Sequence, residues 1–206
     1  DIPTAMMLIL GPTILTNFFQ IVRNGSITNV ITKTWPFMLT STIFVPLGLL
    51  CVVDYPGFPF ERLLGGVISL YSLASLRGFQ WIISDDRKSV VGVFSGLVNS
   101  LLTGMTGSFL VPSIMYLRTF EFSKDDLMCA MGLLFLLSTI VMGGSLFVFG
   151  KATPLLSFLS LFMCIPVGLG VFAGTQVKRV LTEVQFTQIF LWALLVLGLY
   201  LIVFGS

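Results

Sequence analysis

The stretch LLTGMTGSFLVPSIMY, Leu101–Tyr116, decides how this chain folds, because it interrupts an otherwise apolar segment. It holds two glycines, several hydroxyl side chains and Pro112, where a membrane helix would carry leucine or valine. Glycine and proline are the poorest helix formers. Non-helical backbone inside a bilayer is tolerated only where protein buries it or where it lines a wet cavity. The stretch therefore predicts a broken helix in the interior of a membrane protein.

The composition of the whole chain supports a membrane location. Of its 206 residues, 56% are hydrophobic and 10% are charged, with a mean hydropathy of +1.03. Soluble domains carry about 25% charged residues, so the chain is expected to be an integral membrane protein. A net charge of +2 without a basic run argues against a nucleic-acid partner. The chain has no histidine, no nucleophile–base pair and no metal-ligand spacing, so we expect no enzyme activity, cofactor or metal.

Charge-free apolar runs define the expected membrane spans, since about 20 helical residues cross a bilayer. The runs are Ile2–Val22, Pro36–Val53, Leu63–Leu76, Val90–Leu117, Leu127–Phe149, Leu155–Gly174 and Phe186–Phe204. The connections between them are short. The sequence thus predicts an all-α polytopic protein, with residues 1–206 forming one transmembrane domain of about six crossing helices.

The distribution of lysine and arginine indicates that residues 90–117 do not cross. If this segment crossed, the 11 cations would divide almost evenly between the two sides. If it turns back, one side holds only Arg62 and Lys151. The other side then holds Arg23, Lys33, Arg77, Arg87, Lys88, Arg118, Lys124, Lys178 and Arg179. Because cytoplasmic loops are enriched in cations, we predict a re-entrant hairpin, cation-rich loops in the cytoplasm and an external C-terminus.

Arm lengths agree with a hairpin that reverses within the membrane. Val90–Thr103 as a helix would span about 21 Å, and Gly107–Leu117 about 16 Å. We expect the second arm to begin near Gly107 and Ser108, so that free N–H groups and a positive dipole end point inward. With Thr103, Gly104 and Thr106, this turn is a candidate anion site. The alternative is a glycine-rich kink that serves only close helix packing.

Two further polar sets lie on single helix faces. Thr13, Thr16, Asn17 and Gln20 follow helical spacing in the first span, and Ser95 and Asn99 share a face in the re-entrant segment. Polar faces are expensive against lipid, so both should face the bundle interior. Asn17, Gln20 and Asn99 are therefore candidate substrate-binding residues. Interhelical hydrogen bonding without a transport role explains these residues equally well.

The two parts of the chain resemble each other weakly. Pro46–Leu50 (PLGLL) and Pro166–Gly170 (PVGLG) each sit in the middle helix of a three-span group. Residues 90–206 add the re-entrant segment to such a group, which gives an odd number of passes and predicts an inverted repeat. Residues 1–89 would then be the remainder of the first repeat. By analogy, a further Gly-rich broken segment of roughly 30–50 residues is expected before Asp1.

The chain resembles the sulfite exporter TauE/SafE family from Asp1 to its end, most strongly in three stretches. They are GLVNSLLTGMTGSFLVPSIMYL (Gly96–Leu117), the following FSKDDLMCAMGLLFLLST, and the segment Pro166–Ile202. Gly96, Gly104, Gly107 and Pro112 match the family's G-x-x-G-x-G-G motif and its proline. Ser108, Phe109 and Leu110 replace glycines of the motif, and the bulky pair is expected to narrow the turn.

The resemblance implies a membrane transporter for a small anion, namely sulfite, an organosulfonate or a small organic acid. It implies a location in the lipid bilayer, most simply the bacterial inner membrane. The degenerate motif leaves a second class open: a non-transporting scaffold subunit that keeps the transporter fold. Its partner would be a second copy of the chain or another protein of a membrane complex.

Overall fold

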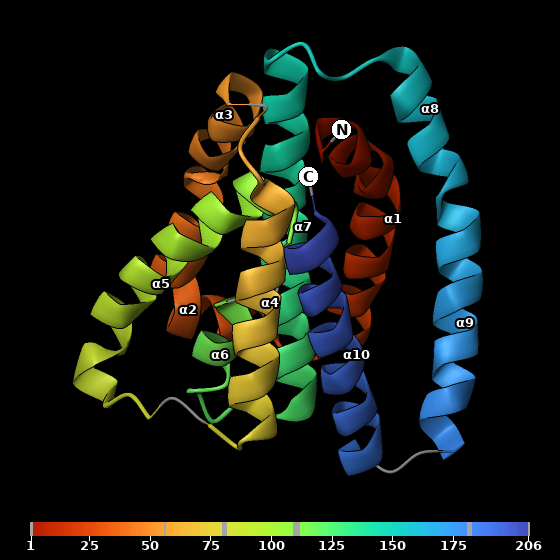
Figure 1. The fold of residues 1–206 in the computed structure, drawn as a ribbon. Helices are drawn as coiled ribbons and strands as arrows, with labels where there is room; N and C mark the ends of the chain where they lie inside the picture. The colour runs from red at the N-terminus through yellow and green to blue at the C-terminus, as the bar shows by residue number, and fades with distance from the viewer. Residues whose placement is uncertain (1, 56, 80–81, 109–111, 181–182, 206) are drawn as a thin grey trace.

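The computed structural model describes residues 2–55, 57–79, 82–108, 112–180 and 183–205 (Figure 1). Its helices are α1 (Ile2–Arg23), α2 (Ile27–Ile43), α3 (Val45–Asp54), α4 (Phe60–Leu76), α5 (Asp85–Thr106), α6 (Ser113–Leu117), α7 (Lys124–Val148), α8 (Pro154–Phe162), α9 (Cys164–Val180) and α10 (Glu183–Phe204). The described residues contain no strand, and the predicted all-α fold is confirmed.

Within the described residues, six helical segments are long and apolar enough to cross a membrane. They are Ile2–Arg23, Ile27–Asp54, Asp85–Thr106, Lys124–Val148, Pro154–Gly174 and Thr187–Phe204. α4, with 17 residues, supplies the additional predicted helix at Leu63–Leu76. The predicted start of the second span at Pro36 is wrong. α2 begins at Ile27, because the Ser26 side chain caps it by accepting a hydrogen bond from the Asn29 N–H, and Pro36 lies inside the helix.

Two of the long segments are broken near a proline. The helix ends at Phe44 between α2 and α3, two residues before Pro46, and at Met163 between α8 and α9, three residues before Pro166. Proline lacks an N–H and its ring clashes with the preceding turn, so it breaks a helix at this place. These are the two stretches whose similarity predicts a repeat, and each begins the second piece of a broken helix.

The segment from α5 to α6 reverses direction and returns to the end of the bundle from which it started (Figure 1). The Tyr116 hydroxyl in α6 donates a hydrogen bond to the Lys88 carbonyl in the first turn of α5, at 2.9 Å. Lys88 Nζ also lies 5.0 Å from the centre of the Phe120 ring, just beyond α6. These contacts join the two ends of the hairpin, so the predicted reversal is confirmed.

The lengths of the two arms differ from the sequence-based expectation. α5 has 22 residues and is long enough to cross a bilayer, whereas α6 has five. Ser84 and the acidic first turn allow α5 to start five residues before Val90, since negative charge stabilises a helix N-terminus. The expected pair of similar half-membrane helices is therefore wrong: one long helix is followed by a short return.

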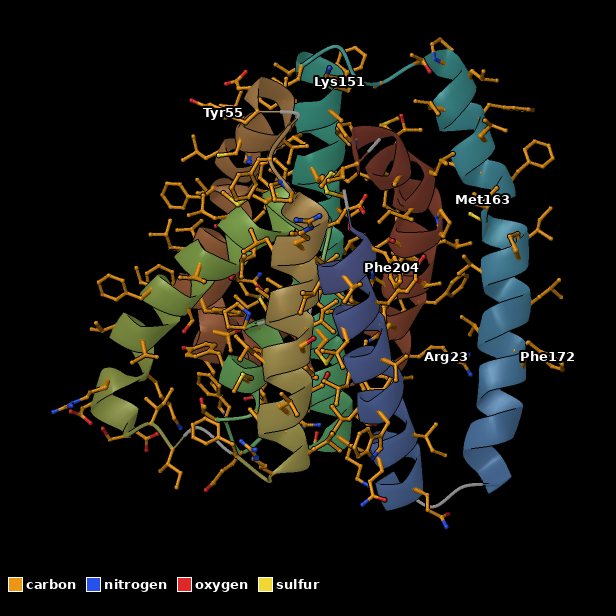
Figure 2. The ribbon with its side chains drawn as sticks, viewed as in Figure 1. Arg23, Tyr55, Lys151, Met163, Phe172 and Phe204 are labelled. Atoms are coloured by element: carbon orange, nitrogen blue, oxygen red, sulfur yellow. The ribbon has the colours of Figure 1, made fainter. Side chains whose placement is uncertain are left out.

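The cations gather at one end of the bundle. Arg23 ends α1, Arg77 caps α4, and Lys33 and Lys88 lie over the rings of Phe122 and Phe120 at this end. At the opposite end, Arg62 donates a hydrogen bond to the Gly205 carbonyl at 3.0 Å. Lys151 lies at that opposite end with Tyr55 (Figure 2). This division agrees with the cation count for a re-entrant segment, while the membrane face that each end meets stays a prediction.

Two helix pairs complete the arrangement. α4 and α10 run antiparallel in close contact, with Gly65 and Gly198 facing each other's backbone. α8 and α9 lie along the edge of the bundle beside α1, bent at Met163 (Figure 2). α9 is largely exposed, and its Phe172 side chain points away from the other helices. The packed core therefore lies among α1, α2, α3, α5 and α7.

Candidate functional site

The inward face of α5 consists of small and polar residues. Its buried positions are Gly92, Ser95, Gly96, Asn99, Ser100, Thr103 and Gly104. Its exposed positions include Val90, Val93, Phe94 and Val98. This polarity is the reverse of that in a soluble protein and fits a helix with lipid outside and a polar interior.

Two glycines of this face allow α5 to cross α2 and α3 closely. A Cβ on Gly96 would lie 2.7 Å from the Phe37 carbonyl oxygen in α2. A Cβ on Gly104 would lie 2.6 Å from the Leu49 amide nitrogen in α3. Real Cβ atoms essentially never come so near, so these positions require glycine for packing. The close-packing interpretation of the glycines is thus supported at Gly96 and Gly104.

Hydrogen bonds within the chain segment itself hold the turn at Gly104–Gly107, which we name the GMTG turn. Gly107 has φ +70°, a left-handed conformation that ends α5, and its N–H donates to the Thr103 carbonyl at 2.8 Å. The Thr103 hydroxyl donates to the Ser108 carbonyl at 3.1 Å. The Ser108 N–H donates to the Thr106 hydroxyl, which itself donates to the Leu102 carbonyl at 2.6 Å. The hydroxyl groups of Thr103 and Thr106, which were predicted to bind an anion, therefore hold the turn together.

The expected helix start at Gly107 and Ser108 is wrong. The αL glycine makes Gly107 a C-terminal cap, so α5 presents carbonyl groups and the negative end of its dipole at the turn. The next helix among the described residues, α6, begins at Ser113. The space that Thr106 and Ser108 share with α4 is too small for a water molecule. Phe109 and Leu110, expected to narrow the turn, lie outside the described residues.

The core contains two apolar clusters, one near each end of the bundle. The first cluster comprises Ile21, Val30, Phe37, Met38, Tyr116, Leu117, Cys129, Ala130 and Leu134. The second cluster comprises Met6, Met7, Val45, Leu49, Met142 and Leu146. Each of α1, α2–α3 and α7 contributes to both clusters, so the residues between the two contributions form the middle of the bundle.

That middle contains buried polar side chains without partners, which we name the polar layer: Ser41, Asn99, Ser138 and Thr139. All four are 0% exposed. Their hydroxyl oxygens, and both the nitrogen and the oxygen of the Asn99 amide, have no hydrogen-bond partner among the described residues. Leaving such a group unsatisfied costs about 1–3 kcal/mol, so each calls for a physical explanation.

Helix contacts place these residues at a common level. Ser138 and Thr139 lie on α7 between Leu134 of the first cluster and Met142 of the second. Ser41 lies on α2, where its backbone nitrogen would be 3.0 Å from a Cβ on Gly96. Asn99 follows Gly96 by less than one turn of α5. The four polar side chains therefore occupy one layer between the apolar clusters.

The predicted site residues of α1, Asn17 and Gln20, form hydrogen bonds to backbone carbonyl groups. The Asn17 side chain is buried and its amide donates to the Thr13 carbonyl, at 2.8 Å. The Gln20 amide donates to the Met128 carbonyl in α7, also at 2.8 Å. Gln20 thus links two helices near the cation-rich end. The structure places Thr103, Gly104, Thr106, Gly107 and Ser108 together at the turn, while Asn99 lies about one helical turn earlier in α5 and Asn17 and Gln20 lie in α1.

Ser41, Ser138 and Thr139 were missed by sequence reasoning. An isolated hydroxyl group in an apolar run shows no helical periodicity. In addition, a serine or threonine in a membrane helix often donates a hydrogen bond to the backbone of its own helix. Thr42 does so to the Met38 carbonyl, at 2.8 Å. The described residues also contain no group of three His, Cys, Asp or Glu side chains placed to hold a metal. The polar layer therefore offers neutral hydrogen-bonding groups only.

A polytopic bundle with broken helices and unpaired polar groups at its centre is the architecture of a membrane transporter. Residues 1–201 match the family model for the sulfite exporter TauE/SafE, and the chain belongs to this family. It is accordingly a membrane transporter of the sulfite and sulfonate exporter type. No curated protein and no solved structure matches the chain.

Proposed function

We propose that this protein is a secondary carrier that moves a small oxyanion through the polar layer. The substrate would be sulfite, an organosulfonate or a small organic acid, as the family membership suggests. The observation that carries the proposal is the Asn99 side chain, which is fully buried and has both amide atoms unpaired. A solute that meets these groups during transport would supply the missing partners.

The chemistry of the polar layer suits passage rather than tight retention. The Asn99 amide supplies two N–H donors, and the three hydroxyl groups supply one each. None of the four side chains carries a formal charge, so an anion would be stabilised by dipoles without a strong ion pair. The other predicted residues would have supporting roles. Thr103, Thr106, Gly107 and Ser108 would hold the hairpin turn, Gly104 would allow close packing, and Asn17 and Gln20 would align α1.

The inverted repeat remains part of the proposal, with residues 1–89 and 90–206 as its members. Each three-helix group has the same order, with a proline-broken helix between two others. In Figure 1, α1 and α7 run in opposite directions, as do α4 and α10. The packing is also reciprocal, because α1 contacts α8 while α7 contacts α2. This relation favours alternating access by movement of one group against the other.

A scaffold without transport activity is the second candidate function. The specific observation in its favour is the GMTG turn, whose hydroxyls are bonded internally beside a space too small for water. Reconstitution into liposomes separates the two candidates. We expect uptake of radiolabelled sulfite, methanesulfonate or a short carboxylate. A monodisperse protein that transports none of them would support the scaffold.

Substitution of Asn99 tests the site itself. Asn99→Ala removes both unpaired amide groups, and we expect at least tenfold slower transport with normal membrane insertion. Ser138→Ala removes one hydroxyl of the polar layer and should have a smaller effect of the same sign. Ser69→Ala is the matched control, because Ser69 is also buried and unpaired but faces Gly198 between α4 and α10. Equal loss of transport in the Ser138 and Ser69 variants would contradict the proposed site.

A further inference from the structure

A second polar cavity, separate from the polar layer, lies at the cation-rich end of the bundle. It has a volume of about 230 Å³ and forms where the end of α4, the end of α6 and the first turns of α10 meet. Its polar lining includes Tyr71 and Ser75 from α4 and Arg118, the residue that caps α6. The cavity thus adjoins the return arm of the hairpin.

The charge of Arg118 is available to a ligand in this cavity. Arg118 forms no ion pair with a described carboxylate, and no Asp or Glu lines the cavity. The Tyr71 residue is 6% exposed and lines the cavity from α4. The cavity therefore holds an uncompensated positive charge beside hydroxyl donors, which favours an anion.

Most of the remaining lining residues are apolar, and they set the shape of that anion. Phe190 and Leu191 of α10 line the side contributed by that helix. An arginine guanidinium matches an oxyanion with two parallel hydrogen bonds, while the apolar side would cover a short carbon chain. Sulfite has no such chain and would leave this wall without a contact.

We propose that this cavity is the vestibule in which the transporter first binds its substrate, and that it selects a small organosulfonate over sulfite. Arg118 binds the sulfonate oxygens, Tyr71 and Ser75 donate hydrogen bonds to them, and Leu191 contacts the carbon chain. This inference rests on the proposed transport function for its place in a transport path. The binding site itself is testable without transport.

Calorimetry on the purified chain in detergent tests binding directly, with sulfite, methanesulfonate, ethanesulfonate and propanesulfonate as probes. We expect the Kd to fall by about fourfold for each added methylene group. Arg118→Gln should raise the Kd for propanesulfonate at least tenfold, and Arg118→Lys should restore part of the affinity. Leu191→Ala should flatten the chain-length series and leave the Kd for sulfite unchanged. Arg87→Gln is the control, since this exposed cation at the same end pairs with Asp86 outside the cavity.

The outcomes distinguish the vestibule from the transport function. Sulfonate binding that is insensitive to Arg118→Gln, or no sulfonate binding at all, overturns the vestibule. Flux in liposomes with an unchanged KM in Arg118→Gln overturns the vestibule and leaves transport standing. Binding that depends on Arg118, without any flux, supports the vestibule and removes the transport function. Size-exclusion profiles identical to the wild type show that each variant is folded.

Discussion

Gly48 of α3 and Gly104 of α5 face each other where the two helices cross, and each leaves no room for a side chain on the other. A Cβ on Gly48 would lie 3.0 Å from Gly104 Cα, and a Cβ on Gly104 would lie 2.8 Å from Gly48 Cα. The crossing fixes the end of α5 against α3, the piece of helix that contains Pro46. The stability of the hairpin therefore depends on these two glycines.

Gly104→Ala should destabilise the protein. The added methyl group collides with α3 backbone atoms, and overpacking of this kind costs about 1–3 kcal/mol. Gly168→Ala is the control, because Gly168 has the place in PVGLG that Gly48 has in PLGLL, and no atom lies within 4 Å of its Cβ position. Thermal unfolding in detergent should show a lower midpoint for Gly104→Ala alone. Equal midpoints for the two variants would contradict the observed crossing.

Tyr116→Phe should loosen the base of the hairpin. The variant keeps the ring, whose centre lies 4.5 Å from that of Phe37, but loses the hydrogen bond to the Lys88 carbonyl. Loss of one such bond costs about 1 kcal/mol. Amide hydrogen exchange should therefore become faster in α6 and in the first turns of α5, and stay unchanged in α10. Equal exchange rates in the wild type and the variant, in both α6 and the first turns of α5, would mean that this hydrogen bond does not hold the two arms together.

Gly107 should tolerate asparagine better than leucine. At φ +70°, a residue with a side chain is strained, and asparagine adopts this conformation more readily than other residues. A Cβ here would lie 3.3 Å from Met6 Cγ, so a large side chain must also displace the Met6 side chain of α1. We expect Gly107→Asn to retain most of its transport and Gly107→Leu to lose it while still inserting. Transport by Gly107→Leu at the wild-type rate would show that the turn geometry is not needed.

Gln20→Leu distinguishes packing from a pathway role for the α1 stripe. The variant removes the hydrogen bond to the Met128 carbonyl and should lower the unfolding midpoint by a few degrees, since one bond contributes about 1 kcal/mol. The KM for sulfite or methanesulfonate should not change, because Gln20 lies apart from the polar layer. A raised KM at unchanged stability would instead place Gln20 in the transport path.

Several elements could be predicted from the sequence because their causes are local. Apolar runs locate the helices, and the poor helix formers around Gly107 locate the break. The division of cations indicates a reversal rather than a crossing, and Tyr116 and Lys88 meet as that reversal requires. The positions of the helix ends were predicted less accurately. Pro36 is tolerated inside α2, and the cap at Ser26 begins that helix earlier than hydropathy suggests.

The candidate site could be predicted only in part, for a physical reason. Asn99 was identified from its polar character on an inward face, but its lack of partners depends on which helices surround it. Thr103 and Thr106 carry the same kinds of group, yet both are occupied within the turn. Ser41 and Ser138 could not be identified from the sequence, because each is an isolated hydroxyl residue in an apolar run.

The amino-acid sequence by itself determined the membrane class, the helix order, the break at the GMTG turn and the family. These follow from the transfer of apolar residues into lipid, from the backbone preferences of glycine and from the charge of short loops, all of which act within a few residues. Only the tertiary structure decided which polar groups remain unpaired, where the second arm begins and which glycines are crossing points. Those properties depend on distances between helices far apart in the chain, because a hydrogen bond forms or fails according to the neighbour that packing brings within about 3 Å.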